Sequence, residues 1–140
     1  MSIADVRLLE LPSFDDDRGI LTAMEACRDV PFEIRRVFFL HGVRQGASRA
    51  GHAHRSSRQF LLPVAGSFRV EVSDAGGSKS YQLADSHHGL YIPTLVWVHL
   101  DNFSANAVCL VLTDTPFDSS EYIREWDDFV RASRAAQVIS

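Results

Sequence analysis

Short apolar stretches separated by turn-forming residues recur along most of this 140-residue chain. Each stretch is four to eight residues long, the usual length of a β-strand. The polar clusters Asp15–Gly19, Asp74–Ser78 and Asp101–Asn102 lie between stretches and suit tight turns. The pattern predicts an all-β sandwich or barrel, with strands at Val6–Leu11, Ile20–Ala26, Ile34–His41, Gln59–Val64, Ser67–Ser73, Lys79–Leu83, Gly89–Ile92, Leu95–Leu100 and Ala107–Thr113.

The spacing of apolar positions changes near the C-terminus. Large apolar side chains recur there at steps of three and four residues, as in an amphipathic helix, at Tyr122, Trp126, Phe129 and Val130. Asp118 suits the N-cap, and Glu121 follows three residues later, as in a capping box. We expect a barrel over about residues 3–115 and a helix over about 119–136, with its aromatic stripe packed on the outside of the barrel.

The composition is that of an ordinary globular protein. Hydrophobic residues make up 46% and charged residues 23%, and the length suits one domain over residues 1–140. No apolar run approaches membrane-spanning length, and Asp5, Arg7 and Glu10 do not suit a signal peptide. These features predict a cytoplasmic protein with no membrane partner. Cys27 and Cys109 show neither ligand nor redox spacing.

The arginines are concentrated in one part of the chain. Ile34–Val70 holds seven of the 14 basic residues and none of the 18 acidic residues. This segment is either a solvated arginine-rich surface or an anion site, since guanidinium forks match phosphate oxygens. Nucleic acid is a poor candidate, because the net charge is −4 and no recognition-helix pattern is present. A small phosphorylated ligand fits an anion site better.

The same segment contains a spaced pair of histidines. The residues read Gly46-x5-His52-x-His54-x4-Gln59-x6-Gly66. Residues at i and i+2 of a strand point to the same face, so both imidazoles would enter one cavity. The spacing resembles the first motif of the cupins, G-x5-H-x-H-x4-E-x6-G, with glutamine in place of the glutamate. The resemblance implies an all-β fold consisting of a single cupin-type (jelly-roll) β-barrel, here with a C-terminal α-helix.

The second cupin motif is altered as well. In Pro93-x4-Val98-x3-Asn102, valine stands where metallocupins have their last histidine ligand. His99 is one residue away, and in a strand that step turns it to the opposite face. Two imidazoles without a carboxylate match the common metal sites poorly. We therefore expect no metal and no other cofactor.

Most of the chain resembles the dTDP-hexose 3,4-ketoisomerases, small cupins of deoxysugar biosynthesis. The resemblance implies metal-independent homodimers that convert dTDP-4-keto-6-deoxy-D-glucose into its 3-keto isomer, so the expected partners are a dTDP-linked keto sugar and a second copy of the chain. The matching segments are Asp17-Arg18-Gly19-x-Leu21, Pro31-Phe32-Glu33-Ile34-x-Arg36-Val37, Arg49-x-Gly51-His52-Ala53-His54, Gly89-Leu90-Tyr91-Ile92-Pro93, Trp97, and Tyr122-Ile123-Arg124 with Phe129.

Moving a carbonyl from C4 to C3 requires removal of the C3 proton, an enediol, and reprotonation at C4. Histidine is suited to exchange protons near neutral pH, so His52 and His54 are the expected catalytic residues, and which of them is the base stays open. Arginine or a glutamine amide can stabilise the developing enediolate. The expected substrate-binding residues are Arg18, Arg36, Arg49, Gln59, Tyr91, Val98 and Asn102.

The chain departs from the resembled family in three places, one of which is Thr94-Leu95 in place of a more usual small or glycine-containing turn. Phe38 and Phe39 stand where its members usually carry tyrosines, and Val98 stands where they have arginine or histidine. Two alternatives therefore stay open. One is a cupin that binds nucleotide sugars without turnover, and the other is a metal-dependent cupin enzyme with only two or three ligands.

Overall fold

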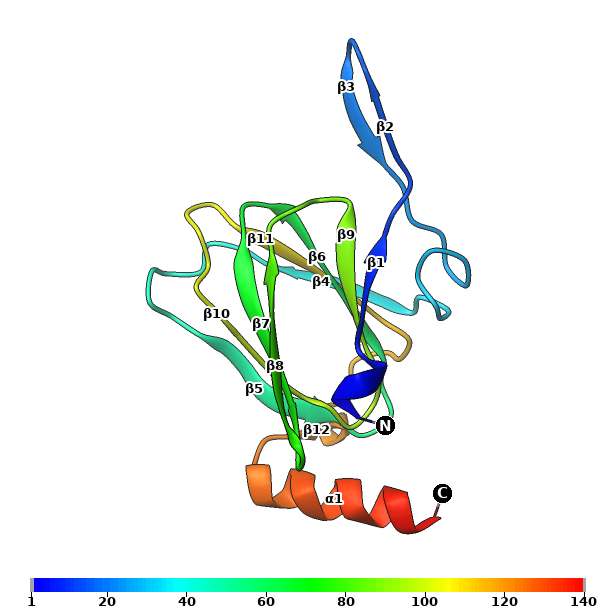
Figure 1. The fold of residues 1–140 in the computed structure, drawn as a ribbon, viewed down its shortest axis with the longest axis vertical. Coiled ribbons are helices and arrows are strands. Elements are labelled where there is room, and N and C mark those ends of the chain that lie inside the picture. The colour runs from blue at the N-terminus through cyan, green and yellow to red at the C-terminus, as the bar shows by residue number, and fades with distance from the viewer. Residues whose placement is uncertain (1, 140) are drawn as a thin grey trace.

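Two five-stranded antiparallel sheets face each other in the computed structural model, which describes residues 2–139 (Figure 1). The first sheet has the order β1 (Arg7–Glu10), β9 (His88–Ile92), β6 (Gln59–Ala65), β11 (Val108–Thr113), β4 (Arg36–Leu40). The second has the order β12 (Tyr122–Ile123), β5 (Arg49–His54), β10 (Trp97–Asp101), β7 (Phe68–Asp74), β8 (Gly77–Leu83). A 3-10 helix, η1 (Ile3–Asp5), precedes β1.

The main core fills the space between the sheets. Strand β10 shows how alternating side chains build this core. Val98 and Leu100 are buried on its inner face. Trp97, His99 and Asp101 are only half-buried on its other face. The predicted all-β architecture is confirmed. The term barrel is loose, however, because no strand of the described chain pairs across from one sheet to the other.

A smaller core covers the outer face of the first sheet. Val30 and Phe32 come from the connection between β3 and β4 and pack against Phe60, Leu62 and Leu112. Residues 59 and 61 of β6 therefore point inward, whereas 60 and 62 point outward. This parity decides which side chains of the neighbouring strands can reach the interior.

The C-terminal helix begins later than the sequence predicted. The helix α1 covers Trp126–Ile139, not 119–136. Asp118 does cap a helix through the Ser120 amide, but this is the short 3-10 helix η2 (Ser119–Glu121), and Tyr122 follows it in β12. Tyr122 matched the helical spacing only because residues 122 and 126 lie four apart.

The aromatic stripe of α1 packs where it was expected. Phe129 is fully buried, and its ring lies 5.7 Å from that of Trp97 on the outer face of β10. Trp126 meets the same Trp97 edge-on at 5.4 Å. No helix among the described residues is long and apolar enough to cross a membrane.

A two-stranded hairpin of β2 (Ser13–Asp16) and β3 (Gly19–Thr22) projects from the end of the molecule opposite α1 (Figure 1). Strand β2 was not predicted, because its residues include two of the acids assigned to a turn. Phe14, Ile20 and Leu21 are each at least 60% exposed on this hairpin. Such exposure of large apolar side chains is uncommon on a surface that has no partner.

Candidate active site

The cavity between the two sheets contains the predicted histidine pair and two of the three arginines that were expected to bind substrate. Its volume is about 540 Å³, and it is lined from six strands: β4, β5, β6, β10, β11 and β12. Of the predicted site residues, it contains Arg36, Arg49, His52, His54, Gln59 and Val98. The motif spacing therefore identified one real pocket.

His52 and His54 form a hydrogen-bonded pair inside this cavity. Their Nε2 atoms lie 3.2 Å apart, so one imidazole donates to the other. His54 is buried, and its Nδ1 has no hydrogen-bond partner among the described residues. Gly51 precedes the pair with φ of +84°, a conformation that L side chains rarely adopt, which explains the glycine in the segment Arg49–His54.

Strand register places two further side chains beside the pair. Val98 on β10 lies directly opposite His52, and Tyr122 on β12 lies opposite His54. Directly opposed residues share a face of the sheet, so the valine and the tyrosine both enter the cavity. His99 points out of the cavity and approaches Asp101 at 3.4 Å, as the one-residue step predicted.

Both histidines are held in the neutral form. Burial lowers the pKa of His52 to about 4, and the positive charge of Arg124 adds to the effect. Burial likewise lowers the pKa of His54 to about 4, assisted by His52, while Glu121 acts in the opposite direction. A neutral imidazole has a free lone pair, which is what a general base needs.

These lowered pKa values predict that the free energy of unfolding depends on pH. The unfolded chain binds protons on both histidines below about pH 6.5, whereas the native chain does so only near pH 4. Stability is therefore full above pH 6.5 and falls as the pH drops toward 4, by at most roughly 1.4 kcal/mol per pH unit per histidine. His52 contributes less, because it is partly exposed.

Urea unfolding at several pH values between 5 and 7.5 measures this dependence. Most carboxylates titrate below this range, so they disturb it little. We expect the His54→Gln variant to show a flatter profile than the parent. An equally steep profile in His54→Gln would contradict the assignment, and His41→Gln, which changes an exposed histidine outside the cavity, is the control.

Three arginines give the cavity a cationic wall. Arg36 is half-buried and packs its guanidinium 4.4 Å from the Phe38 ring centre, while Arg49 and Arg124 are exposed. No acidic residue is among the described residues that line the cavity. An uncompensated cluster of guanidinium groups attracts an anion such as a pyrophosphate.

Tyr122 and Arg124 are the site residues that sequence reasoning missed. The Tyr122 ring centre lies 4.8 Å from that of His52 and 4.6 Å from that of His54, and Arg36 donates to its hydroxyl over 3.4 Å. The alternation of side chains along a strand could have revealed these two residues, since 122 and 124 would share one strand face. The tyrosine also supplies a hydroxyl that the substitution at Phe38 removes. Phe39 points outward and is 56% exposed.

The cavity fits a metal ion poorly. Gln59 is buried and faces the cavity as predicted, but its amide is neutral. Val98 offers no donor atom. Only the two imidazoles are strong ligands, and they already bond to each other.

Three predicted substrate-binding residues do not reach the cavity of their own chain. Tyr91 pairs with Phe60 across the sheet and therefore shares its outward face, where it packs against Phe32. Asn102 lies in the exposed turn after β10, with φ of +53°. Arg18 lies on the projecting hairpin and pairs with Asp16.

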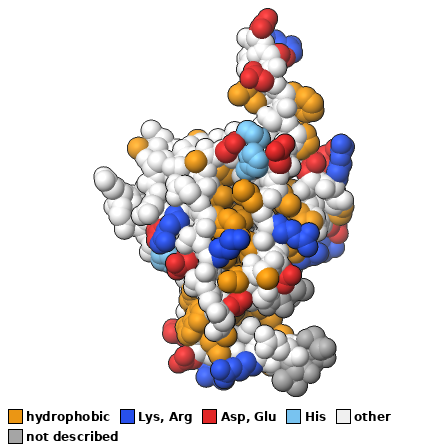
Figure 2. All heavy atoms as spheres, in the orientation of Figure 1, with side chains coloured by type: hydrophobic (Ala, Val, Ile, Leu, Met, Phe, Trp, Pro, Cys, Tyr) orange, Lys and Arg blue, Asp and Glu red, His pale blue; other side chains and the backbone are white. Residues whose placement is uncertain are grey.

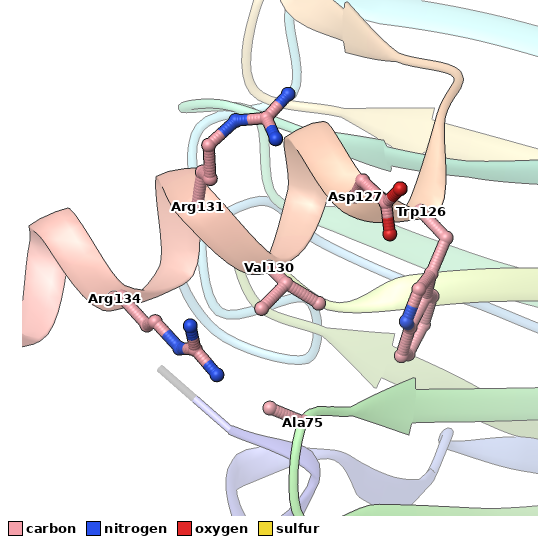
Figure 3. A pocket seen from close by; sticks show the side chains of 6 residues that line it. All are labelled: Ala75, Trp126, Asp127, Val130, Arg131 and Arg134. Carbon is pink, nitrogen blue, oxygen red and sulfur yellow. The ribbon is translucent and has the colours of Figure 1, made fainter.

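A second hollow lies outside this site, between α1 and the turn after β7 (Figure 3). Val130 and Arg134 point toward Ala75 there, whereas Arg131 points away and pairs with Asp128. This groove holds no histidine, and its walls come from exposed helix residues. Asp127 is the carboxylate that lines it, and this side chain is exposed and has no histidine beside it among the lining residues.

The chain is similar in sequence to known sugar isomerases. The family model described as FdtA, "WxcM-like, C-terminal", matches residues 4–134. A TDP-4-oxo-6-deoxy-α-D-glucose-3,4-oxoisomerase of Aneurinibacillus thermoaerophilus is 32% identical over 123 residues, which is 88% of each chain.

Solved structures give the same result. A 3,4-ketoisomerase from Helicobacter canadensis is 33% identical, with a TM-score of 0.90 over 93% of this chain and 98% of that one. A variant of the 3,4-ketoisomerase QdtA from Thermoanaerobacterium thermosaccharolyticum, in complex with TDP-4-keto-6-deoxyglucose, is 30% identical, with a TM-score of 0.91 over 94% and 95%.

The two facing sheets, and the histidine pair and arginines in the pocket between them, define a small cupin. Within that class, the chain belongs to the FdtA family, whose relatives compared above are sugar 3,4-ketoisomerases. The family predicted from the sequence is confirmed.

Proposed function

We propose that this chain is a nucleotide-sugar 3,4-ketoisomerase that converts dTDP-4-keto-6-deoxy-D-glucose into its 3-keto isomer. The observation that carries the proposal is the neutral histidine pair, with Nε2 atoms 3.2 Å apart, in a cavity walled by arginines. The named activities of the relatives identify the substrate class.

In the proposed reaction, one imidazole of the pair removes the proton from C3 of the sugar. The C–H electrons form the C3=C4 double bond, and the C4 oxygen takes up the negative charge and then a proton. Reprotonation at C4 and loss of the C3 hydroxyl proton then leave the ketone at C3. Tyr122 and Arg36 can donate hydrogen bonds to the oxygen that becomes negative.

The pyrophosphate is assigned to the mouth of the cavity. Arg49 and Arg124 line the cavity and are exposed, whereas Arg36 lies deeper and is fixed by aromatic rings. The nucleotide and the reacting sugar would then occupy opposite ends of one pocket. A cytoplasmic location, expected from the sequence, stays a prediction.

The direct test is incubation with dTDP-4-keto-6-deoxyglucose in D₂O, followed by NMR of the product. We expect a 3-keto sugar with deuterium at C4, since the enediol takes its new proton from exchangeable groups, and we expect the rate to be unchanged by EDTA. Tight dTDP binding without any product would favour the non-catalytic binding protein. Loss of turnover in EDTA, restored by one metal, would favour the metal-dependent enzyme.

The homodimer is proposed from apolar surface that a single chain leaves uncovered. Strand β4 is a sheet edge, and its outward side chains Val37 and Phe39 are each more than half exposed. Within the described chain, the β2–β3 hairpin pairs with no strand of the other sheets, and it exposes Phe14, Ile20 and Leu21. A second copy of the chain would cover both surfaces. In such a dimer, the projecting hairpin would place Arg18 toward the site of the partner subunit.

We expect light scattering to give a mass of twice 15.6 kDa, the mass of one chain. An Ile20→Asp or Phe39→Asp substitution should convert the protein to a monomer, because a buried unpaired carboxylate is costly. Leu8→Asp, on the opposite edge strand β1, changes a similarly exposed apolar residue and is the control. A parent chain that is monomeric at micromolar concentration would contradict the proposed dimer.

A further inference from the structure

A second group of histidines lies far from the cavity, in the turn between β8 and β9. Asp85, His87 and His88 present ligand atoms that all lie within 4.8 Å of one another. In Figure 2, histidine side chains lie between acidic side chains at the foot of the projecting hairpin. All three residues are accessible, with side-chain exposures of 46%, 40% and 29%.

Hydrogen bonds of the backbone hold this segment in place. The Asp85 carboxylate accepts from the His87 amide at 3.1 Å, and the His88 amide donates to the Asp85 carbonyl oxygen at 3.1 Å. The His87 carbonyl oxygen accepts from Leu11 at 2.7 Å, and His88 is paired with Glu10 in the β1–β9 ladder. The group is therefore part of the sheet edge and is ordered before any ligand binds.

His88 is surrounded by more acceptors than a neutral imidazole can satisfy. Its Nδ1 lies 3.0 Å from Oδ2 of Asp85, and its Nε2 lies 3.4 Å from Oε2 of Glu10. A neutral ring has one proton for these two carboxylates. With the proton on Nε2, the Nδ1 lone pair faces a carboxylate oxygen, an arrangement that a cation held by both atoms would stabilise.

His87 points its Nδ1 at the other oxygen of the same carboxylate, Oδ1 of Asp85. Both Nδ1 atoms therefore approach the one carboxylate, each at a different oxygen. Glu10, on the far side of His88, is placed as the carboxylates that orient metal-bound histidines usually are. Imidazole and carboxylate ligands together suit Zn²⁺, Ni²⁺ and Cu²⁺ rather than Mg²⁺ or Ca²⁺.

We propose that Asp85, His87 and His88 form a binding site for a divalent transition-metal ion, with Glu10 orienting His88. The three protein ligands leave coordination positions for water. The site joins the β8–β9 turn to the end of β1, from which the β2–β3 hairpin departs. A bound ion would stabilise this corner of the molecule without touching the cavity.

Zinc titration by calorimetry tests the site, provided that other side chains able to bind zinc are first replaced. The appropriate background is the full chain carrying His52→Asn, His54→Asn and Cys27→Ser, because the cavity pair and the exposed cysteine also have affinity for zinc. We expect one Zn²⁺ per chain in this background. We also expect zinc to raise Tm, since a ligand that binds only the native state stabilises it.

Variants in this background separate the ligands from general effects. His88→Ala should abolish zinc binding, and Glu10→Gln should weaken it about 10-fold, the low end for a lost orienting carboxylate. Asp85→Asn keeps an oxygen that can accept the hydrogen bond from the His87 amide, but it loses the negative charge. It therefore tests Asp85 as a metal ligand without unfolding the turn. His41→Ala is the control for an exposed histidine elsewhere.

Absence of zinc binding in the background protein would overturn the proposal. Unchanged binding in both His88→Ala and Asp85→Asn would do the same. In the otherwise unmodified chain, His88→Ala should leave ketoisomerase turnover unaltered, because His88 does not line the cavity. The zinc titration and the isomerase assay therefore succeed or fail independently.

Discussion

Replacing His52 with asparagine should lower kcat by about 100-fold or more, the usual scale for a lost general acid–base group. Asparagine can still form hydrogen bonds but cannot accept a proton from carbon. His52 is neutral in the folded chain and lies in the same cavity as the three arginines, so only its proton-transfer role should be lost. Initial rates with the keto sugar measure the effect.

Binding should change little in the same variant. The arginines that we assign to the nucleotide are untouched by the substitution, so the Kd for dTDP should stay within about threefold of the parent value. A histidine-to-asparagine variant of QdtA is known in complex with TDP-4-keto-6-deoxyglucose, which is consistent with retained binding in a relative. His41→Asn is the matched control, since it makes the same change outside the cavity.

His54→Asn distinguishes the two members of the pair. If His52 is the base and His54 supplies or relays the returning proton, both substitutions impair turnover, because the shared Nε2 hydrogen bond links them. If His52→Asn turned over at the parent's rate while His54→Asn did not, His54 alone would carry the proton transfer. Normal rates in both variants would remove the histidine pair from the mechanism.

The parts of the site that the sequence predicted are those fixed by position within one strand. His52 and His54 are two residues apart, and strand parity alone brings both into one cavity. The same alternation of side chains placed Val98 inside the cavity and His99 outside it. Arg36 and Arg49 followed from the family resemblance and from the concentration of arginines around the motif.

The positions that the sequence did not specify depend on contacts between distant segments. Tyr91 falls in a matched segment, but its face is set by its pairing with Phe60, which the sequence does not specify. Tyr122 matched a helical spacing and yet pairs with His54, because the two-residue strand β12 precedes α1 and adds to the sheet. Arg18 depends on the direction in which a two-stranded hairpin leaves the body, which local residues do not determine.

Replacing Arg49 with alanine should weaken dTDP binding by about 10- to 150-fold, the equivalent of a charge-assisted hydrogen bond worth roughly 1.5–3 kcal/mol. Arg49 lines the cavity, is exposed, and has no hydrogen-bond or ion-pair partner among the described residues. Its guanidinium is therefore available to a ligand without breaking an existing contact. Arg36, in contrast, already packs on Phe38 and Phe117 and bonds to Tyr122.

Arg44→Ala provides the matched control for this effect. Arg44 is an exposed arginine of the same acid-free segment and does not line the cavity, so its loss changes the net charge equally. Arg49→Lys keeps the charge but loses the fork that grips two phosphate oxygens, so its affinity should fall between those of the parent and Arg49→Ala. Equal weakening by Arg44→Ala and Arg49→Ala would show that the arginines act only through long-range attraction. Unchanged affinity in Arg49→Ala would place the pyrophosphate elsewhere, and Arg124 at the same cavity mouth would then be the next residue to replace.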